Sequence, residues 1–447
     1  MPMKKAWIGV LAVVLGLAMA LPAAAIDWSA KGFIVNVGAL YKNVGSSALQ
    51  SWTDWTGGYV RTRGRLFITA RASENLYGVF GFEIDASRWG RTGKDPNAPG
   101  GDAGAWGADQ TAVEVKHMYV DFKIPGIDVP VWMRLGVQPF AVRPVVFLSR
   151  DGSGVLIRSK VEGVTLQGFF GMIKDEQTNG NDFEDKDSAE IYGVYGDVKI
   201  PNTDLKAGAY VVWADVRGGA LNLTHYDNGS YWWIGGFTQG KVGPVKAEFD
   251  VFYNGGTIDA ESGTTAKDKD IDAWVVRGVL TYPYDKFNLG VGGYYATGDD
   301  ESTNDLENAQ YPGSTEGYPS KDLLVIYGNW MGATYALGPT FIGPRAEECG
   351  IWYARGFVFY QALDWLNLGF QVAYIGDTVE DGDNWGTDAS DDDDIGWEFD
   401  VGAKVKVYKN LTWTTAFGYL VAGDALDQAG GDPEDPWLVV SSLAYTF

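Results

Sequence analysis

Apolar and polar residues alternate along most of this chain. In one clear run Ala247, Phe249 and Val251 alternate with Glu248 and Asp250. Because successive side chains of a β-strand point to opposite faces, such runs predict strands with one apolar and one polar face. The same alternation returns at residues 287–292, 366–374 and 397–407. The runs have about the length, roughly 9–11 residues, that a tilted strand needs to cross a bilayer.

The connections between these runs alternate in length. Short ones include residues 74–75, 162–163, 243–244 and 409–410, and long ones include residues 88–110, 257–269, 298–345 and 377–394. We therefore predict an all-β fold, a transmembrane antiparallel β-barrel with short periplasmic turns and long extracellular loops. Counting the predicted hairpins gives about 18 strands, with 16 as the alternative. A soluble β-sandwich would need a second layer of matching apolar faces and would not explain the sidedness of the loops.

The chain begins like an exported protein. Lys4 and Lys5 precede an apolar run at residues 6–21, and Pro22 and three alanines follow. This is the pattern of a secretory signal peptide, which we place at residues 1–25. The alternative, an N-terminal membrane anchor, is less favoured because the run is short for a spanning helix. Residues 26–447 show no linker and are expected to form one barrel domain.

Composition narrows the chemistry. The 447 residues carry a net charge of −23, two His and one Cys. Cys349 alone excludes an intrachain disulfide, and the absence of a Cys-x-x-Cys-His motif excludes covalent c-type haem on this chain. Neither His117 nor His225 lies in a metal-binding spacing or beside a nucleophile motif, so we assign them no role and expect no enzyme activity. An acidic chain of this kind is not expected to bind nucleic acid.

Cations gather on one face of an early strand. Residues 59–71 place Arg61, Arg63, Arg65 and Arg71 on one face and no charged residue on the other. On later strands the expected inward cations are Arg134, Arg158 and Lys160. Charges that line the narrow part of a pore set its selectivity, so these residues predict a basic, anion-preferring constriction.

Carboxylates are expected on the same inner surface. They are Glu83, Asp85, Glu248, Asp250, Glu398 and Asp400. A three-residue turn at residues 74–76 would bring Glu83 and Asp85 near Arg63 and Arg65. Together the charges predict a transverse field, with cations of early strands facing carboxylates of later ones. The alternative is that the charges pair across strands and only keep the wall hydrated.

Residues 139–153 are too apolar for an exposed extracellular loop. They include Phe140, Phe147 and Leu148 as well as the cations Arg143 and Arg150. We consider three interpretations equally: a loop that folds into the barrel and brings both arginines to the constriction, a contact between subunits, or additional strand.

Acidic residues gather in the expected outer loops, at residues 299–301, 380–383 and 388–394. Such clusters can hold Ca²⁺ or Mg²⁺, which bridge lipopolysaccharide, but none has an EF-hand spacing. Solvated loops are the favoured interpretation. No metal site and no cofactor are therefore assigned, and a divalent cation at these loops stays an alternative.

Several short segments resemble a known family. Arg61-Thr-Arg-Gly-Arg65, Phe82-Glu-Ile-Asp85 and Val115-Lys-His-Met-Tyr-Val-Asp121 are similar to segments of the homotrimeric porins of sulfate-reducing and related deltaproteobacteria, which are Gram-negative. The last strand, ending at Phe447, resembles the C-terminal strand that the barrel-assembly machinery recognises in outer-membrane proteins. The resemblance implies a homotrimeric diffusion porin in contact with outer-membrane lipid and lipopolysaccharide. Residues 298–345 depart from the family and leave the solute open.

Three functions remain in view. The first is a passive porin for small hydrophilic solutes with a basic constriction. The second is a barrel that sheathes a multihaem cytochrome in extracellular electron transfer, which would need haem from another chain and an unobstructed lumen. The third, an outer-membrane hydrolase, is the least favoured because it would have to use His117 or His225.

Overall fold

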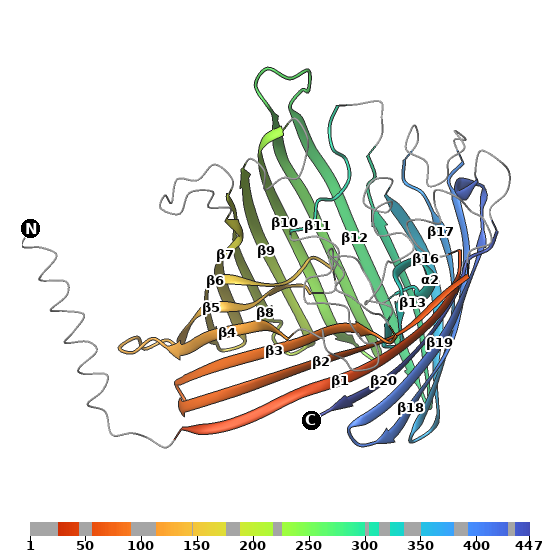
Figure 1. Ribbon diagram of the computed structural model, residues 1–447, viewed down its shortest axis with the longest axis horizontal. Coiled ribbons are helices and arrows are strands. Elements are labelled where there is room, and N and C mark those ends of the chain that lie inside the picture. Colours follow the sequence, from red (N-terminus) through yellow and green to blue (C-terminus); the bar gives the residue numbers. More distant parts are fainter. Residues whose placement is uncertain are drawn as a thin grey trace, which may run out of the picture.

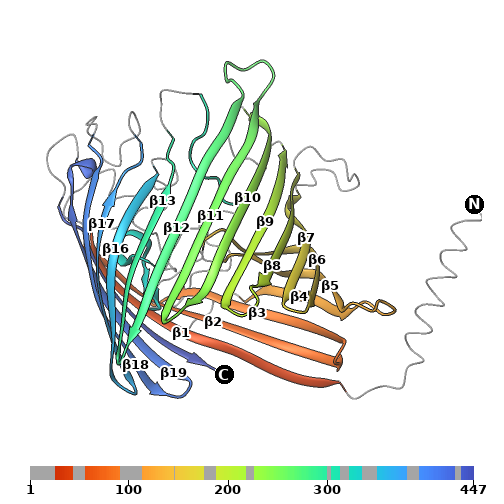
Figure 2. The same ribbon diagram turned by 180° about the vertical axis from the view of Figure 1, so that it is seen from behind.

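The computed structural model describes residues 26–43, 56–90, 113–144, 146–175, 188–217, 226–299, 304–312, 322–334, 350–379, 392–427 and 434–447. These residues form an antiparallel sheet of 18 strands that closes into a barrel (Figures 1 and 2). The prediction of an 18-stranded barrel is confirmed, and the alternative of 16 strands is wrong. Among the described residues no helix is long and apolar enough to cross a membrane. The predicted signal peptide lies outside them.

The barrel strands follow the chain in order. They are β1 (Asp27–Lys42), β2 (Thr56–Ser73), β3 (Leu76–Arg88), β4 (Glu114–Lys123), β5 (Val131–Val142), β6 (Leu148–Val161), β7 (Val164–Asp175), β8 (Ser188–Lys199), β9 (Asp204–Arg217), β10 (Tyr226–Val242), β11 (Val245–Ala260), β12 (Lys269–Tyr284), β13 (Phe287–Ala296), β16 (Ile351–Leu363), β17 (Leu366–Gly376), β18 (Asp394–Tyr408), β19 (Leu411–Ala422) and β20 (Trp437–Thr446). Outside the barrel sheet are α2 (Leu324–Tyr327), β14 (Asn329–Trp330), β15 (Ala333–Thr334) and the 3₁₀ turn η2 (Asp424–Leu426).

The first and last strands close the barrel. β1 pairs with β2 along one edge and with β20 along the other, from Phe33 opposite Thr446 to Lys42 opposite Trp437. Closure pairs the backbone of every barrel strand on both sides and leaves no exposed edge. Every other barrel strand pairs with its neighbours in sequence order.

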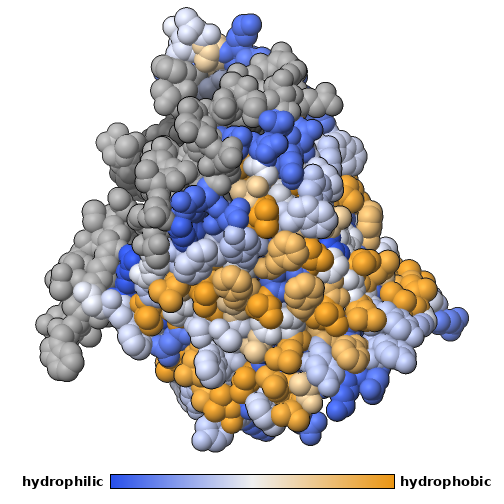
Figure 3. All heavy atoms as spheres, turned by 90° about the vertical axis from the view of Figure 1, so that its right-hand side faces the viewer, coloured by the Kyte–Doolittle hydropathy of each residue, from blue (hydrophilic) through white to orange (hydrophobic). Residues whose placement is uncertain are grey.

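The alternation in the sequence becomes two surfaces of one wall. On β18 Trp397 and Val401 point outward and are 47% and 51% exposed, whereas Glu398 and Asp400 point inward and are almost fully buried. Figure 3 shows apolar side chains gathered over the lower half of one side of the barrel. This outer surface is the one that a bilayer would cover.

The two ends of the barrel differ. At one end the strands are joined by tight turns, and β1 begins and β20 ends there; in Figure 1 the turns of the first strands lie at the left and those of β16–β19 at the bottom. At the other end the connections are longer, as predicted. Two of them do not stay outside, because parts of the β5–β6 and β13–β16 connections lie within the barrel. The expectation that residues 298–345 form an outer loop is therefore wrong for residues 322–334, which contact the inner wall.

Candidate functional site

The β5–β6 hairpin crosses the inside of the barrel. We call its distal part, residues 139–152, the inner hairpin. Its Phe147 is 1% exposed and packs in an aromatic cluster on the opposite wall. Ring centroids lie 4.8 Å from Tyr210 of β9, 5.8 Å from Trp233 of β10 and 5.3 Å from Phe252 of β11. Aromatic burial of this kind fixes the tip against β9–β11.

Arg143 anchors the same tip electrostatically. Its Nη2 donates to Asp250 Oδ2 at 2.7 Å, its Nε donates to Oδ1 of the same carboxylate, and Nη1 donates to Gln239 at 2.5 Å. The guanidinium also lies over Phe237, 4.2 Å from the ring centroid. A bidentate pair is geometrically specific, so Arg143 holds the tip of the hairpin to β10 and β11.

The three interpretations of residues 139–153 can now be compared. The segment folds into the barrel, and strand continues through most of it, since β5 extends to Val142 and β6 begins at Leu148. Its apolar residues Phe140, Val142 and Leu148 are already 5%, 1% and 2% exposed within one chain, so their burial needs no neighbouring subunit.

A second segment, residues 322–334, covers another part of the inner wall. We call it the inner segment; it contains α2, β14 and β15. The backbone N–H of Leu324 donates to Asp400 at 3.2 Å, and those of Val325 and Ile326 donate to Glu398 at 2.8 and 3.2 Å. These N–H groups begin a helical turn and lack partners within it, so the two carboxylates complete their hydrogen bonding.

Asp322 locks the inner segment to the wall. Its carboxylate accepts two hydrogen bonds from Arg277 of β12, at 2.9 and 3.1 Å, and one from Arg355 of β16 at 2.6 Å. The hydroxyl of Tyr353 also donates to it at 2.8 Å. Burial by itself would raise the pKa of Asp322, but Arg355 and Arg277 outweigh it and hold the pKa below its usual value. Asp322 is therefore ionised under physiological conditions.

Glycines make room for the inner segment. Gly369 of β17 and Gly402 of β18 lie opposite each other, and a Cβ at either would come within 3 Å of the sulfur of Met331. A Cβ at Gly418 of β19 would lie 2.8 Å from Val325. Because these glycines have no side chains, the inner wall has a groove there, and the inner segment fills it.

The inner segment and inner hairpin change the expected role of the later carboxylates. Asp250, Glu398 and Asp400 point inward, but they are 3%, 0% and 1% exposed because these segments cover them. As open pore-lining groups these three were predicted wrongly. Glu248 has a side chain 53% exposed and lies 3.3 Å from Arg277. The side chain of Asp85 lies outside the described part.

The cations of β2 meet a carboxylate on β3. Arg65 makes two hydrogen bonds to Glu83, both 2.9 Å, and Arg63 lies 3.2 Å from the same carboxylate. Lys116 of β4 is also 2.8 Å from Glu83 and 2.7 Å from Asp151. Three cations therefore share one carboxylate, with Asp151 as a second partner for Lys116. Cross-strand pairing therefore occurs on this wall, and a third carboxylate, Glu114, lies opposite Glu83 in the register.

Lys116 also belongs to this cluster, although the alternation of residues along the chain did not predict it. Strict alternation places only one of Lys116 and His117 inside the barrel. A β-bulge where Gly81 pairs with His117 and Phe82 with Val115 turns both inward. His117 then lies 2.8 Å from Asp151. The doubled polar pair in an otherwise alternating run was the only signal in the sequence. His225 is outside the described residues.

The other predicted cations have separate surroundings. Arg134 and Arg158 both bind Asp121, which is fully buried, with N–O distances of 2.8 and 2.9 Å. Arg61 lies over the ring of Tyr59, and Arg71 over that of Tyr77, each 4.7 Å from the centroid. Lys160 is exposed near the short-turn end of β6.

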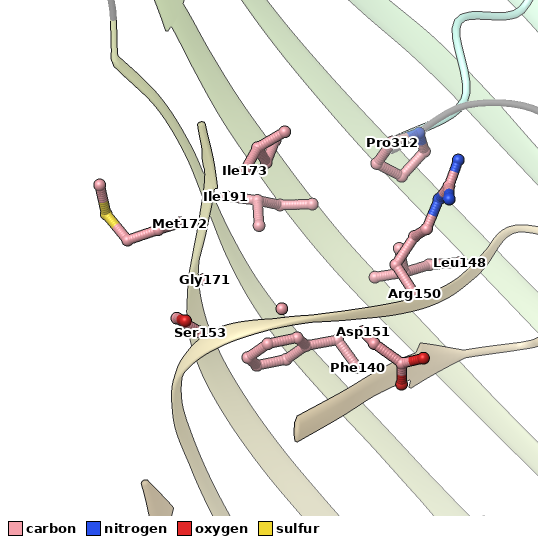
Figure 4. Close-up of a pocket in the computed structure, with 11 residues that line it drawn as sticks. Phe140, Leu148, Arg150, Asp151, Ser153, Gly171, Met172, Ile173, Ile191 and Pro312 are labelled. Carbon is pink, nitrogen blue, oxygen red and sulfur yellow. The ribbon is translucent and has the colours of Figure 1, made fainter. Parts of the chain in front are cut away.

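The narrow space lies between the inner hairpin and the β2–β4 wall. A cavity of about 220 Å³ is lined there by Arg65, Lys116, Arg150 and Asp151, among other residues. A second cavity of about 460 Å³ lies between the hairpin, β7 and β8. Figure 4 shows Arg150 extending beside Pro312, with Phe140 and Asp151 below it. Arg150 and Asp151 thus line both spaces.

No group of three or more potential metal ligands occurs among the described residues. Most of the acidic segments at residues 299–301, 380–383 and 388–394 lie outside this part of the chain. Asp299, which is described, accepts a hydrogen bond from the backbone N–H of Glu307 at 2.8 Å.

Comparisons with known proteins place the fold. No protein-family model matches the chain, and no curated protein matches its sequence. OccK8 (OprE) of Pseudomonas aeruginosa has a TM-score of 0.55 at 13% identity, over 94% of this chain and 98% of that one. The outer membrane protein OpdK of the same organism has a TM-score of 0.52 at 11% identity, over 94% and 98%. OccAB2 of Acinetobacter baumannii has 0.53 at 11%, over 95% and 99%. The likeness shows a shared barrel fold.

Proposed function

We propose that this chain is a passive porin of the Gram-negative outer membrane with a basic, anion-preferring constriction. The observation that carries the proposal is the cluster of Arg63, Arg65 and Lys116 around Glu83, where the inner hairpin narrows the barrel. An excess of fixed cations along a narrow, water-filled passage with low-dielectric walls raises the local concentration of anions and lowers that of cations. Arg150 on the hairpin adds a cation from the facing side.

The outer-membrane location rests on two observations. The outer surface of the barrel is apolar, and the fold is shared with OpdK, which is an outer membrane protein. We further propose a homotrimer of the deltaproteobacterial type, insertion through a C-terminal strand ending at Phe447, and contact with lipopolysaccharide. These proposals come from the resemblance of the sequence, together with export through a cleaved signal peptide.

The inner hairpin and inner segment weigh against a sheath for a cytochrome. Such a sheath needs an unobstructed lumen, whereas both segments are held inside by buried ion pairs, Arg143–Asp250 and Asp322–Arg355. A diffusion porin uses constricting segments of this kind to set the width and charge of its passage. The geometry therefore favours a filter for small solutes.

Conductance in a planar bilayer tests the proposal. Purified protein should give stable channels, and the reversal potential in a salt gradient should indicate anion preference. Arg63→Ala with Arg65→Ala should weaken that preference. Arg217→Ala changes the last residue of β9, at the end of the barrel with the long connections, and should leave the preference unchanged. Cation preference would reject the basic filter. A folded protein without conductance would reject the porin itself.

A further inference from the structure

Six lysines follow the inner wall near the short-turn end. This lysine arc consists of Lys123, Lys160, Lys199, Lys206, Lys241 and Lys246, on β4, β6, β8, β9, β10 and β11. Each lies within three residues of the end of its strand at the short turns. Their inward direction follows from alternation: Lys123 is two residues from the buried Asp121, and Lys246 is four from the buried Asp250.

Carboxylates do not balance this arc. Lys206 pairs with Asp197 at 2.9 Å, and Asp204 lies opposite Lys241 in the register. The remaining lysines of the arc form no ion pair with another described residue. Glu248, inward on β11 and two residues from Lys246, lies 3.3 Å from Arg277. Asp128 and Glu162 sit at exposed positions in the turns.

The arrangement also places like charges together. Lys199 lies directly opposite Lys206, and Lys241 directly opposite Lys246. Like charges directly opposite each other on one face are destabilising, with Cβ atoms roughly 4.5–5.5 Å apart. At the same level, the inward residues of β12, β13 and β17 are uncharged, for example Thr281, Asn288 and Asn367. The arc thus places two pairs of lysines directly opposite each other at a cost in stability, whereas Lys31 on β1 and Lys406 on β18, also inward at this end, have no lysine opposite them.

We propose that the lysine arc is a second anion-binding zone, which captures multivalent anions from the short-turn side of the barrel. Molecules with several phosphate or carboxylate groups fit it, because neighbouring ammonium groups are separate point charges that one such molecule can bridge. Because the lysines point into the lumen, the ligand is a soluble anion rather than a bilayer lipid. The arc lies near Gln239 and Asp250, where Arg143 anchors the inner hairpin, so it serves the space below the constriction.

Binding can be measured without any channel activity. Inositol hexakisphosphate should bind the purified protein in uncharged detergent at low salt, as followed by calorimetry, and binding should weaken steeply as salt is added. Lys241→Gln with Lys246→Gln should weaken binding at least about fivefold, because it removes two charges from the arc. The matched control is Lys31→Gln with Lys406→Gln, two inward lysines at the same end that have no lysine opposite them. An equal loss in the control, or no binding by the native protein, would overturn the arc as a site.

A second experiment determines from which side of the membrane the arc is reached. It rests on the proposed porin function. In single channels at about 0.1 M salt, where the Debye length is about 10 Å, block by inositol hexakisphosphate should be about tenfold faster from one side than from the other. The Lys241→Gln and Lys246→Gln variant should lose this difference, and the control variant should keep it. Equal block from both sides contradicts the arc while leaving the porin intact. Absent conductance contradicts the porin, and calorimetry still decides the arc.

Discussion

Glu83 should limit the anion preference of the passage. Its carboxylate is 3% exposed and lies within 3.2 Å of Arg63, Arg65 and Lys116. Glu83→Gln keeps the size of the side chain and its ability to accept hydrogen bonds but removes the negative charge. The wall at the inner hairpin then gains one net positive charge, so anion preference should rise.

The size of the effect follows from Coulomb's law. For an ion passing about 6 Å from the site in water, one unit charge contributes about 0.7 kcal/mol. Screening at about 0.1 M salt reduces this to about 0.4 kcal/mol. An anion is then favoured about twofold and a cation disfavoured about twofold, so the permeability ratio of anions to cations should rise about fourfold.

The variant should remain folded. Breaking a fully buried ion pair costs about 3–5 kcal/mol, but the side chains of Arg63 and Arg65 are 19% and 26% exposed, so water in the lumen lowers this cost. The change in electrophoretic mobility on heating checks that the barrel is intact.

The assay is the reversal potential of single channels in a salt gradient. Glu74→Gln is the matched control, because it removes the same charge from the turn between β2 and β3. An anion preference that is unchanged or lower in folded Glu83→Gln would refute the assignment of this cluster to the constriction.

Three further outcomes are expected. Val401→Arg places a charge on the outward face of β18 and should lower barrel stability by about 2–4 kcal/mol in unfolding measurements. Lys404→Gln, on the inward face, should lower it little. Equal losses of stability would reject the assignment of the two faces of β18. Asp322→Asn breaks a buried ion pair and should lower the stability of the protein by about 3–5 kcal/mol. It should also release the inner segment and so increase the current noise of single channels. Burial alone would raise the pKa of Asp322, but Arg355 and Arg277 lower it. The stabilisation by ionised Asp322 is therefore complete above the usual value of 3.8 and is lost as pH falls through the lower pKa of the folded state. Current noise of the native channel should rise only at such acidic pH, and the noise of Asp322→Asn should not change with pH. Arg143→Gln should free the inner hairpin and raise conductance, and Asp250→Asn should do the same; normal conductance in both would show that aromatic packing alone holds the tip.

The barrel was predictable because its signal is local. Trp397, Phe399 and Val401 alternate with inward residues whatever the rest of the chain does, since the period of two comes from the backbone of a strand. Turn lengths added the sidedness, and the run of arginines at residues 61–65 marked one wall of the lumen. Each of these inferences needs only neighbouring residues.

The contents of the barrel depended on contacts between distant parts of the chain. Arg143 and Asp250, or Asp322 and Arg355, are brought together only once the wall has closed, and nothing in either local pattern specifies the partner. Glycines 369 and 402 stood in the alternating runs, but an inward glycine has meaning only when another segment approaches it. Lys116 depended on a bulge that shifts the register by one residue.

The sequence by itself therefore determined the wall: an antiparallel barrel, which face of each strand points inward, and where cations are concentrated. The tertiary structure decided which charges remain available to a solute. Glu398 and Asp400 are covered by the inner segment and Asp250 by Arg143, whereas Arg65, Lys116 and Arg150 line the narrow cavity. The physical reason is that alternation fixes the direction of a side chain, whereas its exposure depends on what packs against it from across the lumen.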